Sequence, residues 1–191
     1  HFPPSTLAGV HRARHLAKHL PAYGWRPIIV RVDERQYIET PDPALSRLVP
    51  SSVEQVRADA VPAKLARLMG VGDIGLRGYS GLGQAIAKAS LRFGAKAVLI
   101  TGAPFYPMLL SGRIARRLKI PVVLDFQDPW VQETTGSLWS KAGIAHRLAV
   151  LLEPQAVRAA SFITSVSDTQ NEQMWLRYRW LDRSRMRAIP I

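Results

Sequence analysis

The pattern of apolar and polar residues alternates between two periods along most of the chain. In some stretches apolar residues recur every three or four positions, which indicates amphipathic helices. Between them lie short runs of β-branched and large apolar residues, which indicate strands covered on both faces, as in parallel sheets. The predicted helices span residues 10–20, 63–69, 82–93, 104–118, 138–159 and 168–178. The predicted strands span residues 27–32, 53–58, 95–100, 122–124, 161–166 and 186–191.

Strands that alternate with helices specify an α/β fold. We expect a doubly wound, mostly parallel, Rossmann-like sheet with helices on both faces. The sequence opens with a loop and a helix that would follow a first strand, so we expect one domain over residues 1–191 that lacks its first strand. A length of 191 residues and a hydrophobic content of 47% are sufficient for a real core.

The segment 70–83 holds six glycines, and we expect it to be the most mobile part of the chain. Residues 70–75 match the dinucleotide pattern G-x-G-x-x-G, but that pattern needs a preceding strand and here follows a predicted helix. The sequence therefore does not predict a dinucleotide site. No G-x-x-x-x-G-K-[ST] phosphate loop occurs, which weakens any assignment as a nucleoside triphosphatase.

The formal net charge of +12 favours anionic partners such as nucleic acid or a membrane surface. The basic residues extend from Arg12 to Arg187, with local concentrations at residues 11–19 and 177–187, and solvated helix faces explain such runs. We expect the basic residues of the first helix to lie opposite its apolar side. Cysteine is absent, which excludes disulfides and thiolate metal sites, and no apolar run approaches the ~18 residues of a spanning helix.

The candidate binding and catalytic residues lie where two predicted strands end. Asp125, Gln127 and Asp128 follow the strand at 122–124, while Thr101 and Gly102 follow the strand at 95–100. Ligands bind at the carboxyl ends of strands in parallel sheets, so these residues are candidates for binding or catalysis. Alternatively, the two carboxylates only cap the next helix or accept turn hydrogen bonds.

Several motifs resemble the N-terminal domain of the GT-B glycosyltransferases of family four. The most specific one is Leu118-Lys-Ile-Pro-Val-Val-Leu-Asp-Phe-Gln-Asp-Pro-Trp130, in which Gln127 replaces the usual arginine. Weaker matches cover almost the whole chain. They are Phe2-Pro-Pro with Gly9, His15-Leu-Ala-Lys-His-Leu20 with Gly24-Trp25, Thr101-Gly-Ala-Pro104, the positions Glu153, Ala156, Ala159, Ala160, Ile163, Ser165 and Ser167, and Ile189-Pro190-Ile191.

The resemblance implies transfer of a sugar from a nucleotide-sugar to a glycan or lipid-linked acceptor, with retention of configuration and without a metal or other cofactor. It implies that Asp128 orients or deprotonates the acceptor and that Gly9, Thr101, Gly102, Asp125 and Gln127 bind substrate. The donor-binding C-terminal domain of this family is absent from these 191 residues, so we expect the chain alone to be inactive.

The same resemblance suggests a cytoplasmic protein, with the basic first helix in peripheral contact with the inner membrane face. Two other functions stay open. One is a basic, non-catalytic α/β binding module for nucleic acid or an anionic surface. Only Trp175-Leu-Arg-Tyr-Arg-Trp180 shows the interleaved aromatic and arginine residues expected of a nucleic-acid surface, so the sequence does not favour nucleic acid as a partner. The other is a nucleotide-sugar epimerase of the same architecture.

Overall fold

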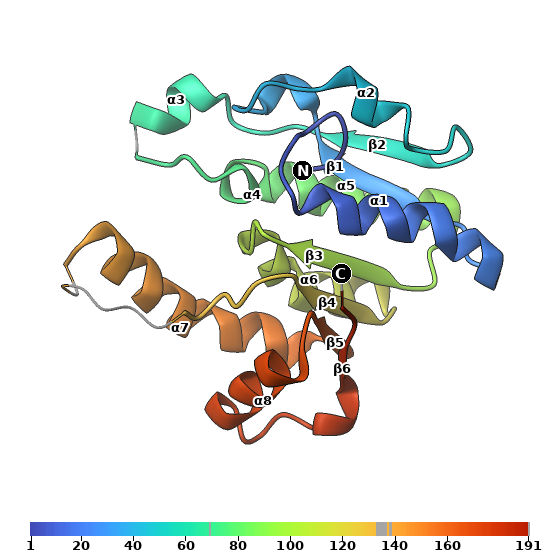
Figure 1. Ribbon diagram of the computed structural model, residues 1–191. Coiled ribbons are helices and arrows are strands. Elements are labelled where there is room, and N and C mark those ends of the chain that lie inside the picture. The colour runs from blue at the N-terminus through green and yellow to red at the C-terminus, as the bar shows by residue number, and fades with distance from the viewer. Residues whose placement is uncertain (69, 133–136, 138, 191) are drawn as a thin grey trace. The chain divides into compact units, whose positions relative to one another are not determined.

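The computed structural model describes residues 1–68, 70–132, 137 and 139–190, and these residues form two compact units (Figure 1). Unit 1 comprises His1–Ala95 and unit 2 comprises Lys96–Ile191. Both units consist of parallel strands and helices, and the chain is an α/β fold with helices on both sides of the sheets. The predicted fold class is confirmed, while the predicted organisation as one domain stays a prediction.

Unit 1 contains a sheet of two parallel strands. Strand β1 pairs with β2 in a register that runs from Ile28 opposite Glu54 to Val32 opposite Ala58. Helix α5 packs on both strands and buries Leu82, Ile86 and Ala89. The elements of this unit are α1 (Val10–His19), η1 (Leu20–Tyr23), β1 (Ile28–Val32), η2 (Glu34–Gln36), α2 (Pro43–Ser46), β2 (Glu54–Ala58), α3 (Ala63–Leu68), α4 (Ile74–Arg77) and α5 (Tyr79–Phe93).

Unit 2 contains a sheet of four parallel strands in the order β3-β4-β5-β6. Its central strand β4 is covered on both faces, because Val122, Leu124 and Phe126 are fully buried. This burial explains the unbroken apolar run in the sequence. The elements are β3 (Val98–Gly102), η3 (Tyr106–Leu110), α6 (Ser111–Leu118), β4 (Val122–Phe126), α7 (Lys141–Ala159), β5 (Phe162–Ser165), α8 (Asp168–Arg177), η4 (Arg183–Arg185) and β6 (Met186–Ala188).

Several predicted boundaries are wrong. Strands β3 and β4 each extend two residues beyond their predicted ends, because Thr101 and Gly102 pair with Asp125 and Phe126. The predicted helix at 104–118 is a 3-10 helix, η3, followed by the α-helix α6 from Ser111. Helix α7 begins at Lys141, since the Ser140 side chain caps it by accepting from the Gly143 N–H at 3.0 Å. The helix continues through Pro154 without a division.

Some predicted positions fall outside the described residues. These are Met69 at the end of one predicted helix, the loop residues Thr134, Thr135 and Gly136, the predicted helix start at Leu138, and Ile191 at the end of the last predicted strand.

Most of the glycine-rich segment is helical, and its expected mobility stays a prediction. Residues 74–77 form α4, and α5 begins at Tyr79. Gly81 lies against the backbone just after β2: a Cβ atom there would stand 2.9 Å from the carbonyl carbon of Asp59 and still closer to its oxygen. Glycine at this position therefore permits close packing of α5 on the chain that leaves the sheet.

The buried side of the first helix includes an arginine. Val10 and Ala17 are buried as expected, but Arg12 is buried as well, at 7% exposure. The expectation that all basic residues lie opposite the apolar side is therefore wrong for Arg12, whereas His15, Lys18 and His19 are exposed. No helix in the described ranges combines the length and the apolar character that a membrane span requires.

Replacement of Gly81 by alanine tests the packing of α5. Alanine normally favours a helix, but here its Cβ would overlap the Asp59 carbonyl group, so we expect the free energy of unfolding to fall by about 1–3 kcal/mol. Urea denaturation followed by tryptophan fluorescence measures this change. Gly72→Ala is the control, because a Cβ at Gly72 meets nothing within 4 Å. Equal stability of the two variants would contradict the proposed contact.

Candidate functional site

A buried carboxylate connects three neighbouring strands of unit 2. Asp125 of β4 lies in register with Thr101 of β3 and Thr164 of β5, so the three side chains share one face of the sheet. The Thr101 hydroxyl donates to Asp125 Oδ2 at 2.8 Å, and the Thr164 hydroxyl donates to Oδ1 at 2.6 Å. Asp125 is only 1% exposed, so these bonds replace the water that its carboxylate would otherwise bind.

Gln127 continues this network at the carboxyl end of β4. Its side-chain Nε2 donates to Thr101 Oγ1 at 2.8 Å, and its backbone N–H donates to the Gly102 carbonyl oxygen at 3.1 Å. The residue is 7% exposed. We call Thr101, Asp125, Gln127 and Thr164 the strand-end network.

The structure thus brings together four of the predicted site residues and adds one that was not predicted. Thr101, Gly102, Asp125 and Gln127 lie at adjacent strand ends. Thr164 was missed, although a polar residue within the predicted apolar strand at 161–166 was a usable signal. Gly102 is packed tightly, since a Cβ there would stand 2.9 Å from Met108 Cε and 3.0 Å from Phe105 Cδ1.

Asp128 differs from Asp125 because it is exposed. It lies in the short connection after β4, next to Trp130, which packs against the connection after β3. The ring of Trp130 stacks on Phe105 with centroids 5.5 Å apart and planes at 11°, and Tyr106 meets it edge-on at 6.1 Å. These aromatic contacts hold the two strand-end connections against each other.

A second buried carboxylate, Glu153 of α7, supports the same connection. It is fully buried and accepts hydrogen bonds from the Tyr178 hydroxyl at 2.9 Å, from Arg177 Nη2 at 3.3 Å and from the backbone N–H of Val131. Burial raises the pKa of Glu153, although Arg177 and the hydrogen bonds oppose this shift. Burial and the neighbouring carboxylate also raise the pKa of Tyr178.

Gly9 lies in unit 1, immediately before α1. Its φ of −59° is right-handed, so its conformation does not require glycine. The N–H groups of Val10 and His11 donate to the carbonyl oxygens of Leu7 and Ala8, each at 3.1 Å, and thus complete a turn. Contact of this loop with substrate stays a prediction.

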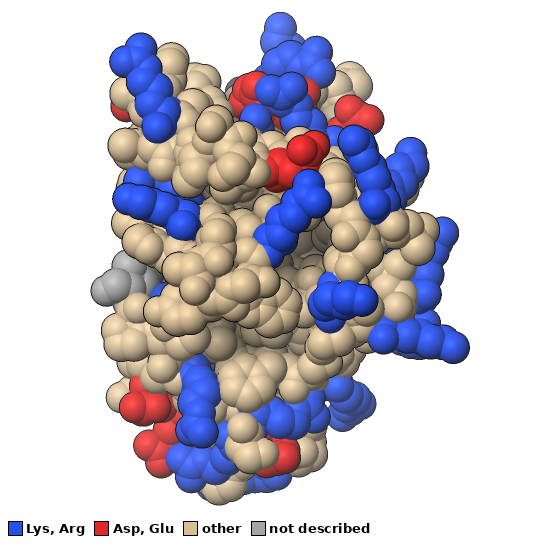
Figure 2. All heavy atoms as spheres, turned by 90° about the vertical axis from the view of Figure 1, so that its right-hand side faces the viewer, with Lys and Arg blue, Asp and Glu red and all other residues tan. Residues whose placement is uncertain are grey.

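The aromatic residues near the C-terminus have partners within unit 2. Tyr178 is buried against Glu153, and Trp175 is flanked by the guanidinium groups of Arg179 and Arg183, at 4.0 and 4.6 Å from its centroid. Trp180 lies under Arg158 at 4.9 Å. The cationic groups therefore stack on the rings that a nucleic acid would use. Elsewhere, lysine and arginine stand singly or in small groups among neutral residues on the face in Figure 2.

Among the described residues, exposed carboxylates follow two strands of unit 2: Asp128 comes directly after β4, beside the buried polar network, and Asp168 comes after β5 at the start of α8. An exposed carboxylate can orient a hydroxyl group or accept its proton, whereas both oxygens of Asp125 already accept hydrogen bonds. The described residues contain no group of three or more His, Asp or Glu side chains that could hold a metal ion. The expectation of catalysis without a metal stays a prediction.

Comparisons with known proteins agree with this geometry. Residues 8–191 match the family described as "Glycosyl transferase 4-like domain". Sucrose-phosphate synthase from Thermosynechococcus elongatus superposes with a TM-score of 0.62 and 13% identity over 99% of this chain and 43% of its own. UGT2 of Phytolacca americana, complexed with UDP-2fluoro-glucose and pterostilbene, superposes with a TM-score of 0.58 and 16% identity over 100% of this chain and 51% of its own.

At these identities the two structural neighbours show the fold alone, and the chain spans about half of their length or less. No curated protein matches the sequence.

Removal of one hydroxyl from the strand-end network tests its structural role. Thr164→Val keeps the side-chain shape but deprives a buried carboxylate of a donor, so we expect the free energy of unfolding to fall by about 1.5–3 kcal/mol. Chemical denaturation measures the change. Thr169→Val makes the same replacement at an exposed position of α8. A loss no greater than that of the control would show that the Thr164 bond does not stabilise the fold.

The raised pKa of Glu153 predicts a pH dependence of stability. Between the ordinary pKa of 4.5 and its raised value, the folded state binds the proton more tightly than the unfolded state, so stability decreases as pH rises through this window. Glu153→Gln removes this pH-dependent contribution to stability, because glutamine does not titrate. We expect the stability difference between Glu153→Gln and the wild type to shift in favour of the variant from pH 4 upward, in urea titrations at several pH values. Glu172→Gln, at an exposed position, is the control and should differ from the wild type by the same amount at every pH. The same constant difference for Glu153→Gln would contradict the predicted pH dependence.

Proposed function

The chain belongs to the glycosyl transferase 4-like domain family, and from this we propose that it is the acceptor-binding half of a retaining glycosyltransferase. The family match over residues 8–191 is the observation that carries the proposal. The chain covers only 43% and 51% of the two structural neighbours, which supports the view that a second, donor-binding domain is needed for transfer. The isolated 191-residue chain is then inactive.

In the proposed reaction an acceptor hydroxyl oxygen bonds to the anomeric carbon of a nucleotide-sugar. The bond from this carbon to the diphosphate oxygen breaks, and the nucleoside diphosphate leaves with the bonding electron pair. Asp128 orients the acceptor hydroxyl or accepts its proton, because it is an exposed carboxylate directly after β4, beside the strand-end network. No metal or other cofactor takes part.

The strand-end network positions the substrate-binding surface in this proposal. Thr101, Gly102, Asp125 and Gln127 hold the connections after β3 and β4 together, and the Trp130–Phe105 stack fixes the backbone beside Asp128. Gly9 contributes the backbone of the loop before α1. The neighbour UGT2 was complexed with UDP-2fluoro-glucose and pterostilbene, which supports a nucleotide-sugar and an acceptor as the general kinds of partner.

We further propose a glycan or lipid-linked acceptor, with the protein at the cytoplasmic membrane face. The exposed His15, Lys18 and His19 of α1 support contact with anionic head groups. Cosedimentation with anionic and neutral vesicles tests this contact, and equal recovery with both would remove it.

The proposed activity is tested on the protein encoded by the complete reading frame. We expect release of a nucleoside diphosphate from one of a panel of nucleotide-sugars, dependent on an added acceptor and insensitive to a metal chelator. If none of the nucleotide-sugars is hydrolysed or transferred, the result counts against a transferase. Interconversion of nucleotide-sugars without an acceptor would indicate an epimerase.

Replacement of Asp128 tests its role within that activity. Asp128→Asn keeps the size of an exposed side chain but removes its charge, so we expect kcat to fall about 10²–10⁴-fold with unchanged stability. Steady-state kinetics with saturating donor measure the change. Asp182→Asn, at an exposed aspartate just before η4 and the amino end of β6, serves as the matched control. Retention of full activity by Asp128→Asn would assign Asp128 to the turn rather than to catalysis.

A further inference from the structure

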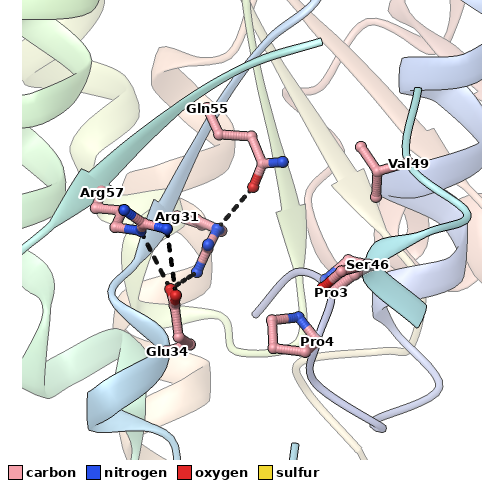
Figure 3. Close-up of a pocket in the computed structure, with 8 residues that line it drawn as sticks. All are labelled: Pro3, Pro4, Arg31, Glu34, Ser46, Val49, Gln55 and Arg57. Carbon is pink, nitrogen blue, oxygen red and sulfur yellow. Dashed lines mark hydrogen bonds and ion pairs between the residues drawn. The ribbon is translucent and has the colours of Figure 1, made fainter. Parts of the chain in front are cut away.

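A pocket of about 330 Å³ lies entirely within unit 1 (Figure 3). One wall comes from Arg31 of β1, Gln55 and Arg57 of β2, and Glu34 just after β1. The opposite side comes from Pro3 and Pro4 of the first loop, from Ser46 at the end of α2 and from Val49 after it. The volume is that of a small-molecule site.

Two arginines stand side by side in this wall. Arg31 and Arg57 are register partners in neighbouring parallel strands, so their side chains project from the same face of the sheet. Like charges directly opposite each other destabilise a sheet unless an anion lies between them. Glu34 fills that role: its Oε2 lies 2.5 Å from Arg31 Nη1 and 3.3 Å from Arg57 Nε. One carboxylate balances two guanidinium groups, which leaves one positive charge.

The wall is held in place before any ligand arrives. Arg31 is 5% exposed, and its Nε donates to Gln55 Oε1 at 3.0 Å. Burial opposes ionisation of Glu34, but the hydrogen bond from Arg31 and the charges of both arginines lower its pKa overall. Glu34 therefore remains an anion and orients both guanidinium groups. A site arranged in advance binds its ligand without the cost of ordering long side chains.

Arg57 has donors left for a ligand. Its side chain is 60% exposed, and two of its five N–H donors, on Nε and Nη2, point to Glu34 at 3.3 Å. The other three N–H donors of Arg57 make no hydrogen bond to the described residues. The apolar rings of Pro3 and Pro4 and the side chain of Val49 face the polar wall across the pocket.

We propose that this pocket binds a small molecule through a carboxylate or phosphoryl group. Arg57 contacts the oxyanion with its planar fork, Arg31 supplies the second positive charge, and the prolines and Val49 contact the apolar face of the ligand body. The inference goes beyond the transfer reaction and does not depend on it, since the pocket consists of unit 1 residues alone.

Isothermal titration calorimetry of the 191-residue chain tests the proposal with three probes of similar size. Glucuronate carries a carboxylate, glucose 6-phosphate carries a phosphoryl group, and glucose carries neither. We expect saturable binding at millimolar concentrations of one or both anions, at least about tenfold tighter than glucose, and weaker at higher salt. The tighter of the two anions identifies the oxyanion that the pocket prefers.

Substitutions locate the binding. Arg57→Gln should weaken anion binding about tenfold or more, and Arg57→Lys, which keeps the charge but loses the fork, should weaken it less. Arg92→Gln removes the same charge from an exposed position of α5 and should leave binding unchanged. Circular dichroism confirms that each variant is folded. Equal binding of glucose, absence of saturable anion binding, or equal affinities of Arg57→Gln and Arg92→Gln would each overturn the proposal. A donor assay is not involved, so this outcome is separate from that of the transferase test.

Discussion

A charged group buried inside a sheet requires partners, and unit 2 is built around this requirement. Asp125 lies in the most enclosed strand, where a carboxylate without hydrogen bonds would cost several kcal/mol. Its two oxygens accept from hydroxyl groups on the strands at either side, Thr101 and Thr164. Thr101 and Thr164 lie 24 and 39 residues from Asp125 along the chain, so these bonds hold β3 and β5 in register with β4. The connections that follow the three strands therefore start from fixed points.

The same physical solution occurs in both units. In unit 1, Glu34 lies between two arginines of adjacent strands, and in unit 2 Asp125 lies between two threonines. In each case one carboxylate accepts hydrogen bonds from side chains on two neighbouring strands. The difference lies in the charge: the Asp125 network contains one acid and neutral donors, whereas the Glu34 group carries a positive excess. The Asp125 network is buried, whereas the Glu34 group lines a pocket.

The sequence was sufficient for the fold class and for the strand ends that carry polar groups. Periodicity located the six described strands and the α-helices of six or more residues, but not the four-residue helices α2 and α4, and the run 122–124 followed by Asp125 and Asp128 marked the end of β4. It could not identify Thr164 as a partner of Asp125, because that pairing depends on strand order. Nor could it show that most of the segment 70–83 is helical, since the need for glycine at position 81 arises from a contact with Asp59.

The connection that carries Asp128 is fastened at both ends. The backbone N–H of Gln127 binds the Gly102 carbonyl group on one side, and that of Val131 binds the buried Glu153 on the other. Between these anchors Trp130 is held in turn by its stack on Phe105, so the backbone beside Asp128 is fixed from several sides. If the chain acts as proposed, acceptor preference changes by exchange of side chains on a stationary backbone and not by movement of the loop.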